Sequence, residues 1–316
     1  MTINRGQIRK QTIPGLNDIV GTNYGSVPEE HKVLFEMENS DRSFEEEVMF
    51  TDLGNAPVKS EGAAVQYDDM QETWTSRYVH ETISLAFSIT EEAMEDNLYD
   101  TFGKVRAKAL GRSMAQTKQI KAAAVFNNGF STSFLGGDGA ALFSASHPTI
   151  GDGNHSNYTN TDLSESALET VLTNISLMKD ERGKLINAQG QSIHIPPQLM
   201  FTIHKILNSV NSTMVQGPAN VQAGVGGDGV TNRNDINALR SMGVLPGGSF
   251  VNHYFTDSDA WFIKTNIPNG TKHFTRRALS YNDSVDFNTG NILYKVSERY
   301  CFGWSDFRGW YGSEGA

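Results

Sequence analysis

The run SASH places two hydroxyl groups beside an imidazole, at Ser144, Ser146 and His147. A serine hydrolase needs a histidine that accepts the proton of the serine and a carboxylate that orients that histidine. Adjacency in sequence does not produce this geometry, and the GxSxG turn that presents the nucleophile in many hydrolases is absent. The run therefore favours a histidine bonded within a turn, and a hydrolase based on Ser144 or Ser146 with His147 is kept as a remote alternative.

The sequence contains no recognisable metal-binding motif. The eight histidines include no HExxH motif, and no carboxylate stands beside a histidine pair on one helix face. The single cysteine, Cys301, can form neither an intrachain disulfide nor a thiolate zinc site. It lies in the apolar segment YKVSERYCFGW, which is typical of a small buried residue. We therefore expect no catalytic residue, no metal and no cofactor.

Two features invite a phosphate-binding interpretation. The run GVGGDGVTN contains Gly224, Gly226, Gly227, Asp228 and Gly229, but no Lys-Ser or Lys-Thr pair follows it and no clear strand precedes it. We interpret it as a flexible loop.

The second feature is a set of cations on one expected helix: Lys104, Arg106, Lys108, Arg112, Lys118 and Lys121. Acidic residues precede them between 91 and 100, an order that suits the helix dipole and favours a solvated face over a nucleic-acid surface.

Composition limits the classes of protein. The chain has 316 residues, 38% of them hydrophobic, and a formal net charge of −10. No apolar run approaches the roughly 18 residues that a membrane span needs, and Arg5, Arg9 and Lys10 are not followed by the apolar segment of a secretory signal. We expect a protein without a membrane segment that stays in the cytoplasm in which it is made. The negative charge suits a container that must not stick to nucleic acid.

The first ninety residues contain two unusual segments. Residues 1–42 show no sustained period, which predicts an extended arm that is disordered or laid along a neighbouring surface. Residues 43–89 predict a long hairpin, because SFEEEVMF and RYVHETISLAFSI suit strands and the turn-rich NAPVKSEGAA lies between them. A hairpin without a core of its own is unstable in water and needs a partner surface. Its tip comprises Pro57, Val58, Lys59, Ser60, Glu61 and Gly62.

The longest element follows the hairpin. Thr90, Glu91 and Glu92 form a favourable helix start, and the run Asn127-Asn128-Gly129 is a stop signal. A helix over 90–126 would be roughly 55 Å long. Its expected apolar stripe, of which Phe102 and Val105 are predicted to pack against a sheet, comprises Leu98, Phe102, Val105, Ala109, Met114, Thr117, Ile120 and Ala124.

The rest of the chain mixes helices and strands. A helix is expected over 164–179, with a stripe of Leu168, Val171, Ile175 and Met178. QSIHIPP suits a strand, and Pro197 suits the first turn of a helix that ends near Asn208. Residues 209–232 are polar and glycine-rich, which predicts a mobile loop. From residue 249 the segments SFVNHYF, AWFIK, KHFTRR and NILYKVSERYCFGW are typical of strands. The predicted fold class is α+β.

Several stretches, in this order along the chain, resemble phage and prophage major head proteins. They are NAPVKSEG, RYVHETISLAFSIT, EEAMEDNLYD, RAKALGRSMAQTKQ, GGDGAALFSASHPT, NDINALRSMGVLPGG, VNHYFTDSDAWFIKT, KHFTRRAL and ERYCFGWSDFRGWYGSEGA. The sequence is thus similar to the tailed-phage major capsid proteins with the Hong Kong 97-type fold, from Tyr24 to the C-terminus.

The resemblance implies a division of the chain. An N-terminal arm would span 1–42, and an extended-loop hairpin with flanking strands would span 43–89. A peripheral domain with the long spine helix would span 90–190, a mainly axial domain 191–270, and return strands to the peripheral domain 271–316. The hairpin tip would overlie an adjacent subunit, and the loop that holds Gly224 to Gly229 would lie near a capsomer axis.

The resemblance also implies a function. The chain would be a major capsid protein and not an enzyme, whose hexamers and pentamers form an icosahedral shell around double-stranded DNA, without sequence-specific binding. It would reside in the virion after assembly in the host bacterial cytoplasm. Expected partners are a portal, a separate scaffolding protein, because the arm is too short for the archetype's long internal scaffold, and, where present, a decoration protein. The alternative within the same fold is an encapsulin-type nanocompartment shell that encloses a cargo enzyme.

Overall fold

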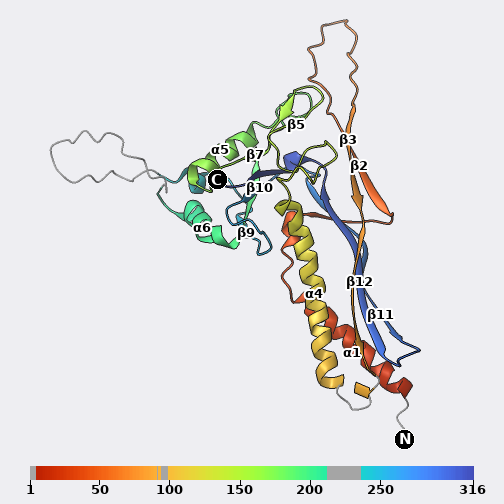
Figure 1. Cartoon of the computed structure of the whole chain (residues 1–316). Coiled ribbons are helices and arrows are strands. Elements are labelled where there is room, and N and C mark those ends of the chain that lie inside the picture. Colours follow the sequence, from red (N-terminus) through yellow and green to blue (C-terminus); the bar gives the residue numbers. More distant parts are fainter. Residues whose placement is uncertain (1–4, 91, 94–98, 212–235) are drawn as a thin grey trace, which may run out of the picture. The chain divides into compact units, whose positions relative to one another are not determined.

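The structure is a computed structural model that describes residues 5–90, 92–93, 99–211 and 236–316, with only the backbone of 5–14 and 99–102. The chain forms two compact units, and each contains its own main sheet (Figure 1). The first unit combines Met1–Glu46, Arg77–Val125 and Lys272–Gly303. The second combines Glu47–Ser76, Phe126–Thr271 and Trp304–Ala316.

The N-terminal segment is largely helical. Helix α1 spans Arg5–Gly25, the short helix α2 spans His31–Leu34, and strand β1 spans Glu36–Asn39. The predicted extended arm was therefore wrong for most of its described length. Pro14 and Gly15 disfavour a helix locally, and the segment shows no sustained apolar period. Leu16 and Val20 are nevertheless buried in one apolar cluster with side chains of the long helix, and this packing stabilises α1.

The sheet of the first unit has the strand order β1-β11-β12-β4. Its long members are β4 (Glu81–Ile89), β11 (Thr271–Val285) and β12 (Ile292–Trp304). β1 runs parallel to β11, and β4 runs antiparallel to β12. Tyr294 and Val296 of β12 pack against α1 and α4, whereas Cys301, five residues beyond Val296, lies on the other face with Tyr78 and Phe274. The prediction that Cys301 is buried is confirmed.

Helix α4 spans Tyr99–Asn127, and it ends where the sequence predicts. Its predicted register was wrong: Val105 is 61% exposed and Ile120 is 50% exposed, while the side chain of Phe102 lies outside the described residues. The buried positions include Ala107, Leu110, Gly111, Met114, Ala115, Ala122 and Ala123. Small side chains occupy the inner face because α1 lies so close that a Cβ on Gly111 would be 2.6 Å from the carbonyl oxygen of Val20.

The second unit is built around a five-stranded sheet of order β7-β13-β10-β8-β9. The strands are β7 (Tyr158–Thr159), β8 (Gly190–Ile195), β9 (Ser249–Val251), β10 (Trp261–Thr265) and β13 (Trp310–Ser313). The central strand β10 pairs antiparallel with both β8 and β13. The strands expected at QSIHIPP and AWFIK are thus confirmed.

Helices cover this sheet with apolar side chains. Helix α5 (Glu165–Ser176) begins at Ser164, whose hydroxyl accepts a hydrogen bond from the backbone of Ala167. A 3-10 turn (Pro197–Leu199) leads into α6 (Met200–Asn208), and α7 spans Ala238–Met242. The predicted stripe of α5 is confirmed, because its members share one core with residues of α6, α7 and the sheet: Leu168, Val171, Ile175 and Met178.

A long hairpin belongs to neither main sheet. Strands β2 (Phe44–Phe50) and β3 (Glu72–Val79) pair with each other, and the segment between them has almost no regular structure. The predicted hairpin is confirmed, but His80 divides the segment RYVHETISLAFSI into β3 and β4. Two further short strands, β5 (His147–Pro148) and β6 (Asn154–His155), pair antiparallel.

Two absences hold within the described residues. No helix there is both long enough and apolar enough to span a membrane. Nor does that part of the chain bring together three or more histidine, cysteine, aspartate or glutamate side chains that could hold a metal ion.

Candidate assembly surfaces

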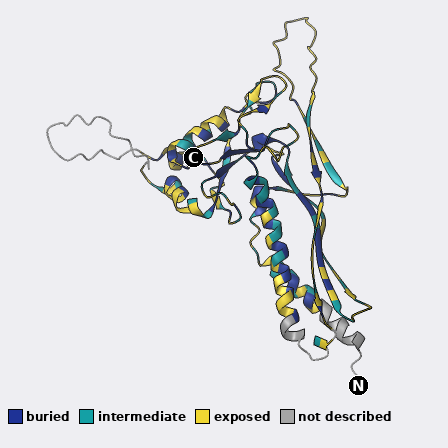
Figure 2. Ribbon diagram, in the orientation of Figure 1, coloured by how far each residue is buried: buried dark blue, intermediate teal, exposed yellow. Residues whose placement is uncertain are grey.

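The segment between β2 and β3 is exposed from Asp52 onward, after the buried Thr51. Every residue from Asp52 to Glu72 is exposed, and Figure 2 shows this loop in the colour of exposed residues. Several of its side chains are apolar: Val58 is 98% exposed, Tyr67 is 93% exposed, and Leu53, Val65 and Met70 are also exposed. Solvent does not favour such side chains, so their concentration on one projecting segment is typical of a surface that another molecule covers.

Charged side chains from another part of the second unit hold the root of this loop. Arg182 donates to Oδ2 of Asp68 at 2.5 Å and to the carbonyl oxygen of Asp69 at 2.6 Å. Lys184 donates to the carbonyl oxygen of Leu53 at 2.5 Å. The backbone N–H of Gly54 and the Arg182 guanidinium both bond to the Asp68 carboxylate, which lowers the pKa of Asp68 below its usual value. These contacts fix the two sides of the loop next to each other.

The turn that supplies these cations is itself rigidly built. Oδ1 of Asp180 accepts hydrogen bonds from the backbone N–H groups of Arg182 and Lys184, each at 2.8 Å. Burial alone would raise the pKa of Asp180, but these hydrogen bonds and the nearby Lys184 ammonium outweigh it and lower that pKa. We call Asp180–Lys184 the anchor turn. Its local bonds pre-orient the two side chains that hold the loop.

A buried ion network supports the anchor turn from the interior. The guanidinium of Arg308, only 6% exposed, pairs with Glu181 and lies 3.4 Å from Asp306, and its Nε donates to the carbonyl oxygen of Lys179 at 2.9 Å. Burial raises the pKa of Asp306, although the charge and the hydrogen bonds of Arg308 partly oppose this. Removing one partner would leave a buried charge without compensation, so the network ties the anchor turn to the segment that leads into β13.

The predicted tip of the hairpin makes only local contacts. The backbone N–H of Ala63 donates to the carbonyl oxygen of Ser60 at 3.1 Å, and Gly62 has a φ of 76°, a left-handed conformation that favours glycine. Among the described residues, Lys59 and Glu61 form no ion pair, and both are exposed. The tip from Pro57 to Gly62 is therefore available to a partner. The other predicted contact residues, Gly224, Gly226, Gly227, Asp228 and Gly229, lie outside the described residues.

The histidine of the SASH run is fully buried and does not face a serine. Nδ1 of His147 lies 2.5 Å from Oδ2 of Asp138, and Nε2 lies 3.0 Å from Oδ1 of Asn157. The ring stacks on Phe307 with centroids 3.8 Å apart. Since both ring nitrogens have other partners, the structure does not assemble a nucleophile and base from Ser144 or Ser146 with His147. The interpretation as a histidine bonded within the fold holds.

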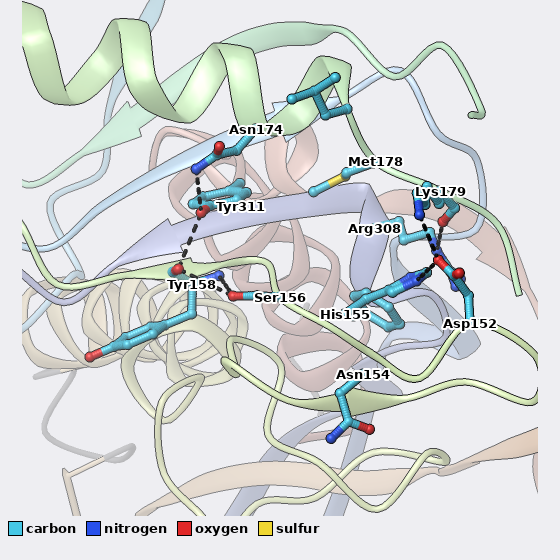
Figure 3. Close-up of a pocket in the computed structure, with 12 residues that line it drawn as sticks. Asp152, Asn154, His155, Ser156, Tyr158, Asn174, Met178, Lys179, Arg308 and Tyr311 are labelled. Atoms are coloured by element: carbon cyan, nitrogen blue, oxygen red, sulfur yellow. Dashed lines mark hydrogen bonds and ion pairs between the residues drawn. The ribbon is translucent and has the colours of Figure 1, made fainter. Parts of the chain in front are cut away.

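A hollow of about 570 Å³ near this region contains the side-chain types of a hydrolase (Figure 3). Asp152 lies 3.0 Å from the Lys179 ammonium and 3.1 Å from Nε2 of His155, and these bonds lower the pKa of Asp152. The hydroxyl of Ser156 donates instead to the carbonyl oxygen of Tyr158 at 3.4 Å. Ser156 therefore forms its hydrogen bonds with Tyr158 and not with His155, and the hollow does not form a catalytic triad.

Comparison with known families identifies the family to which the chain belongs. The phage capsid protein family matches residues 72–313, which is most of the sequence, so the chain belongs to this family. None of the curated proteins matches this sequence. Family and fold together indicate a structural protein of a capsid.

Solved structures share its fold at low sequence identity. The capsid of an empty GTA particle matches with a TM-score of 0.54 and 13% identity over 92% of this chain and 91% of that chain. The capsid structure of Mycobacterium phage Patience matches with a TM-score of 0.52 and 9% identity over 99% and 89%. A virus-like particle from Pyrococcus furiosus matches with a TM-score of 0.51 and 12% identity over 94% and 95%. The chain thus has the Hong Kong 97-type capsid fold, as its sequence predicts.

Sequence reasoning missed the residues that anchor the hairpin. It treated DERGK, residues 180–184, only as a turn between two elements. The available signal was the composition of that turn: an aspartate followed by two cations at steps of two and four, which is more charge than a connection needs. Nothing in the sequence pairs Arg182 with Asp68, because 114 residues separate them.

Proposed function

We propose that this chain is the major shell subunit of a tailed phage or prophage, whose hexamers and pentamers close into an icosahedral shell around double-stranded DNA. In the division that the resemblance implies, α4 would belong to the peripheral domain and β10 to the mainly axial domain. The observation that carries the proposal is the hairpin: the continuous exposed run from Asp52 to Glu72, with several apolar side chains, held firmly at the root and without a partner surface of its own.

The hairpin would cover a neighbouring subunit. Its tip offers Lys59 and Glu61 for charged contacts, each worth only about 0–1 kcal/mol at an exposed site. Symmetry multiplies such contacts, because the same interface recurs between copies throughout a closed shell. The loop near the capsomer axis, with Gly224 and Gly229, would adapt to five-fold and six-fold rings, since glycine adopts different conformations at little steric cost.

Deletion of Pro57–Gly62 tests the hairpin proposal. The deleted chain should remain soluble with the circular dichroism spectrum of the wild type, because the segment lies outside every core, but it should not form stable particles. A variant with the same six positions replaced by glycine and serine separates loop length from side-chain contacts and should assemble weakly. Normal shells from the deleted chain would refute an assembly role, and an unfolded monomer would show that the loop belongs to the core.

The proposed partners follow from the same function. A portal would occupy one vertex, a separate scaffolding protein would guide assembly in the host bacterial cytoplasm, and a decoration protein would bind outside where the phage has one. The packing of Leu16 and Val20 in the core supports a role of α1 in the subunit's own fold and not as a removable scaffolding segment. Intact-mass measurement of mature particles should accordingly show little loss from the N-terminus.

An encapsulin-type shell is the alternative within the fold. The similarity to the virus-like particle from Pyrococcus furiosus concerns the fold alone and does not separate the two functions, whereas the family match favours the phage shell. Imaging of native particles distinguishes them: a portal at one vertex and packaged DNA support the phage proposal, and an enclosed cargo enzyme supports the alternative.

The remote hydrolase alternative has its own test. A serine-reactive probe should not label the chain; labelling that disappears in His147→Ala would support a hydrolase.

A further inference from the structure

Helix α4 has an unusual charge distribution for this chain. From Gly103 to Asn127 it contains six lysines or arginines and no aspartate or glutamate, although the whole chain has a net charge of −10. Cations over the last turn of a helix are explained by the helix dipole. A row that begins near the start of the described helix is not, so the dipole, which on sequence alone favoured a solvated face, does not account for all of these cations.

Internal contacts account for part of the set. Lys118 lies 3.4 Å from Glu298 in the interior of the first unit, and Lys121 pairs with Glu81. Arg106 donates to the carbonyl oxygen of Ser88 at 2.7 Å. These three side chains therefore bind α4 to its own sheet.

Three cations of α4 form an exposed row. Lys104, Lys108 and Arg112 follow at steps of four residues, and the exposed amide of Gln116 continues the row by one more step. Steps of four place successive side chains on one face, about 6 Å apart along the axis. Within the described residues, the side chains of Lys108 and Arg112 form no hydrogen bond or ion pair, and α4 has no acid within four residues of either.

Given the shell function proposed above, we propose that the row Lys104-Lys108-Arg112 binds the phosphate backbone of the enclosed double-stranded DNA. Lysine and arginine offer only hydrogen-bond donors, and the amide of Gln116 adds another. Double-stranded DNA presents one negative charge for about every 1.7 Å of its axis, so a straight row of cations meets a phosphate at every step. Such contact is independent of base sequence.

A DNA surface fits this row better than an acidic protein surface does. Interfaces between proteins usually centre on buried aromatic or aliphatic side chains with charges at the rim. Here the charges are central, and the two large exposed apolar side chains of α4, Val105 and Ile120, lie beside the row and at its end. A face that binds the packaged DNA must look toward the interior of the shell.

Salt dependence of DNA binding tests the proposal on purified full-length protein. The probe is a fluorescent duplex of arbitrary sequence, followed by anisotropy. Three phosphate contacts predict that affinity falls roughly 40-fold when salt rises from about 50 to about 200 mM, since each contact contributes about 0.9 to the logarithmic slope. In Lys108→Gln/Arg112→Gln one contact remains, and the fall should shrink to roughly fourfold.

A matched control removes two exposed cations elsewhere. Lys205 of α6 and Arg240 of α7 are exposed and belong to the other unit, so Lys205→Gln/Arg240→Gln should keep the wild-type salt dependence. An unchanged slope in Lys108→Gln/Arg112→Gln, or no salt-dependent binding by the wild type, would overturn the proposal. So would a variant that binds DNA normally but no longer assembles, because the row would then serve a protein contact. Absence of shells in the wild type, with the slopes as expected, would instead refute the shell function alone.

Discussion

Arg182 bonds to the carboxylate of Asp68 at 2.5 Å, across 114 residues of chain. With the second bond of Arg182 to the carbonyl oxygen of Asp69 and that of Lys184 to Leu53, it closes the root of the long hairpin. The root of the hairpin loop is therefore fixed to other residues of the second unit, although the tip makes only local contacts.

Arg182→Ala should loosen the hairpin without unfolding the chain. Both partners are partly exposed, so thermal stability should change little, while protease cleavage between Asp52 and Gln71 becomes faster. Limited proteolysis with mass spectrometry of the fragments measures this. Lys32→Ala removes another exposed pair, with Glu29, and serves as the control. Equal cleavage rates in the wild type and Arg182→Ala would mean that the anchor turn does not hold the loop.

The approach of α1 to α4 gives a second prediction. A Cβ on Gly111 would lie 2.6 Å from the carbonyl oxygen of Val20 and 3.2 Å from the backbone nitrogen of Tyr24. Gly111→Ala should therefore push the helices apart and reduce the free energy of unfolding by about 1–3 kcal/mol. In α1, a Cβ on Gly15 would meet nothing within 4 Å, so Gly15→Ala should stabilise by about 0.5–1 kcal/mol. Urea denaturation compares the two, and a stabilising Gly111→Ala would contradict the close packing.

Asn157 holds several segments of the second unit together. Its Nδ2 donates to the carbonyl oxygens of Leu142, Phe307 and Trp310, at 2.7, 3.0 and 3.1 Å. Asn157→Asp would direct a carboxylate oxygen at these three acceptors, which should cost about 3 kcal/mol or more. Differential scanning calorimetry at pH 7 should show the loss, whereas Asn154→Asp, at an exposed site, should not. A stable Asn157→Asp would show that the amide is dispensable.

Two buried histidines predict sensitivity to acid. Burial, aided by the Lys118 charge, lowers the pKa of His31 to about 4 and that of His273 to about 3, from 6.5 in the unfolded chain. The rings lie 5.7 Å apart, and His80, Glu29 and Lys32 also act on them. Between its folded and its unfolded pKa value, each histidine binds more protons in the unfolded chain than in the folded chain. The contribution of these histidines to stability is therefore full above about pH 6.5 and is lost as the pH drops toward 4 and 3.

His273→Phe isolates one of these contributions. Neither ring nitrogen of His273 has a hydrogen-bond partner in the described residues, and the ring stacks on Phe302, so phenylalanine should fit. The fall in melting temperature between pH 7 and pH 4 should be smaller in His273→Phe than in the wild type. His204→Phe, at an exposed position of α6, should keep the wild-type fall. The same acid sensitivity in His273→Phe and the wild type would disprove the assignment.

The sequence predicts elements whose own pattern decides their structure. The stripe from Leu168 to Met178 and the proline at Pro197 locate α5 and α6 because burial and backbone geometry act within one helix. The hairpin can be predicted for the opposite reason: its loop has no apolar periodicity and is rich in turn residues. These local signals are enough to predict the α+β fold class and the exposed hairpin.

Other features depend on contacts between distant segments. Helix α1 forms despite Pro14 because Leu16 and Val20 gain burial against α4, and no local pattern records that gain. The register of α4 was mispredicted because its inner face uses alanine and glycine for close packing, while the larger Val105 and Ile120 point to solvent. The link between Arg182 and Asp68 likewise follows from the fold alone.

Electron microscopy of the purified full-length chain tests the central claim, that this protein builds a shell, most directly. Closed shells of uniform size, or rings with five-fold and six-fold symmetry, are the predicted result, because the chain has a capsid fold and a hairpin loop with exposed apolar side chains. Particles that remain monomeric at every concentration, with and without a scaffolding protein, would contradict it.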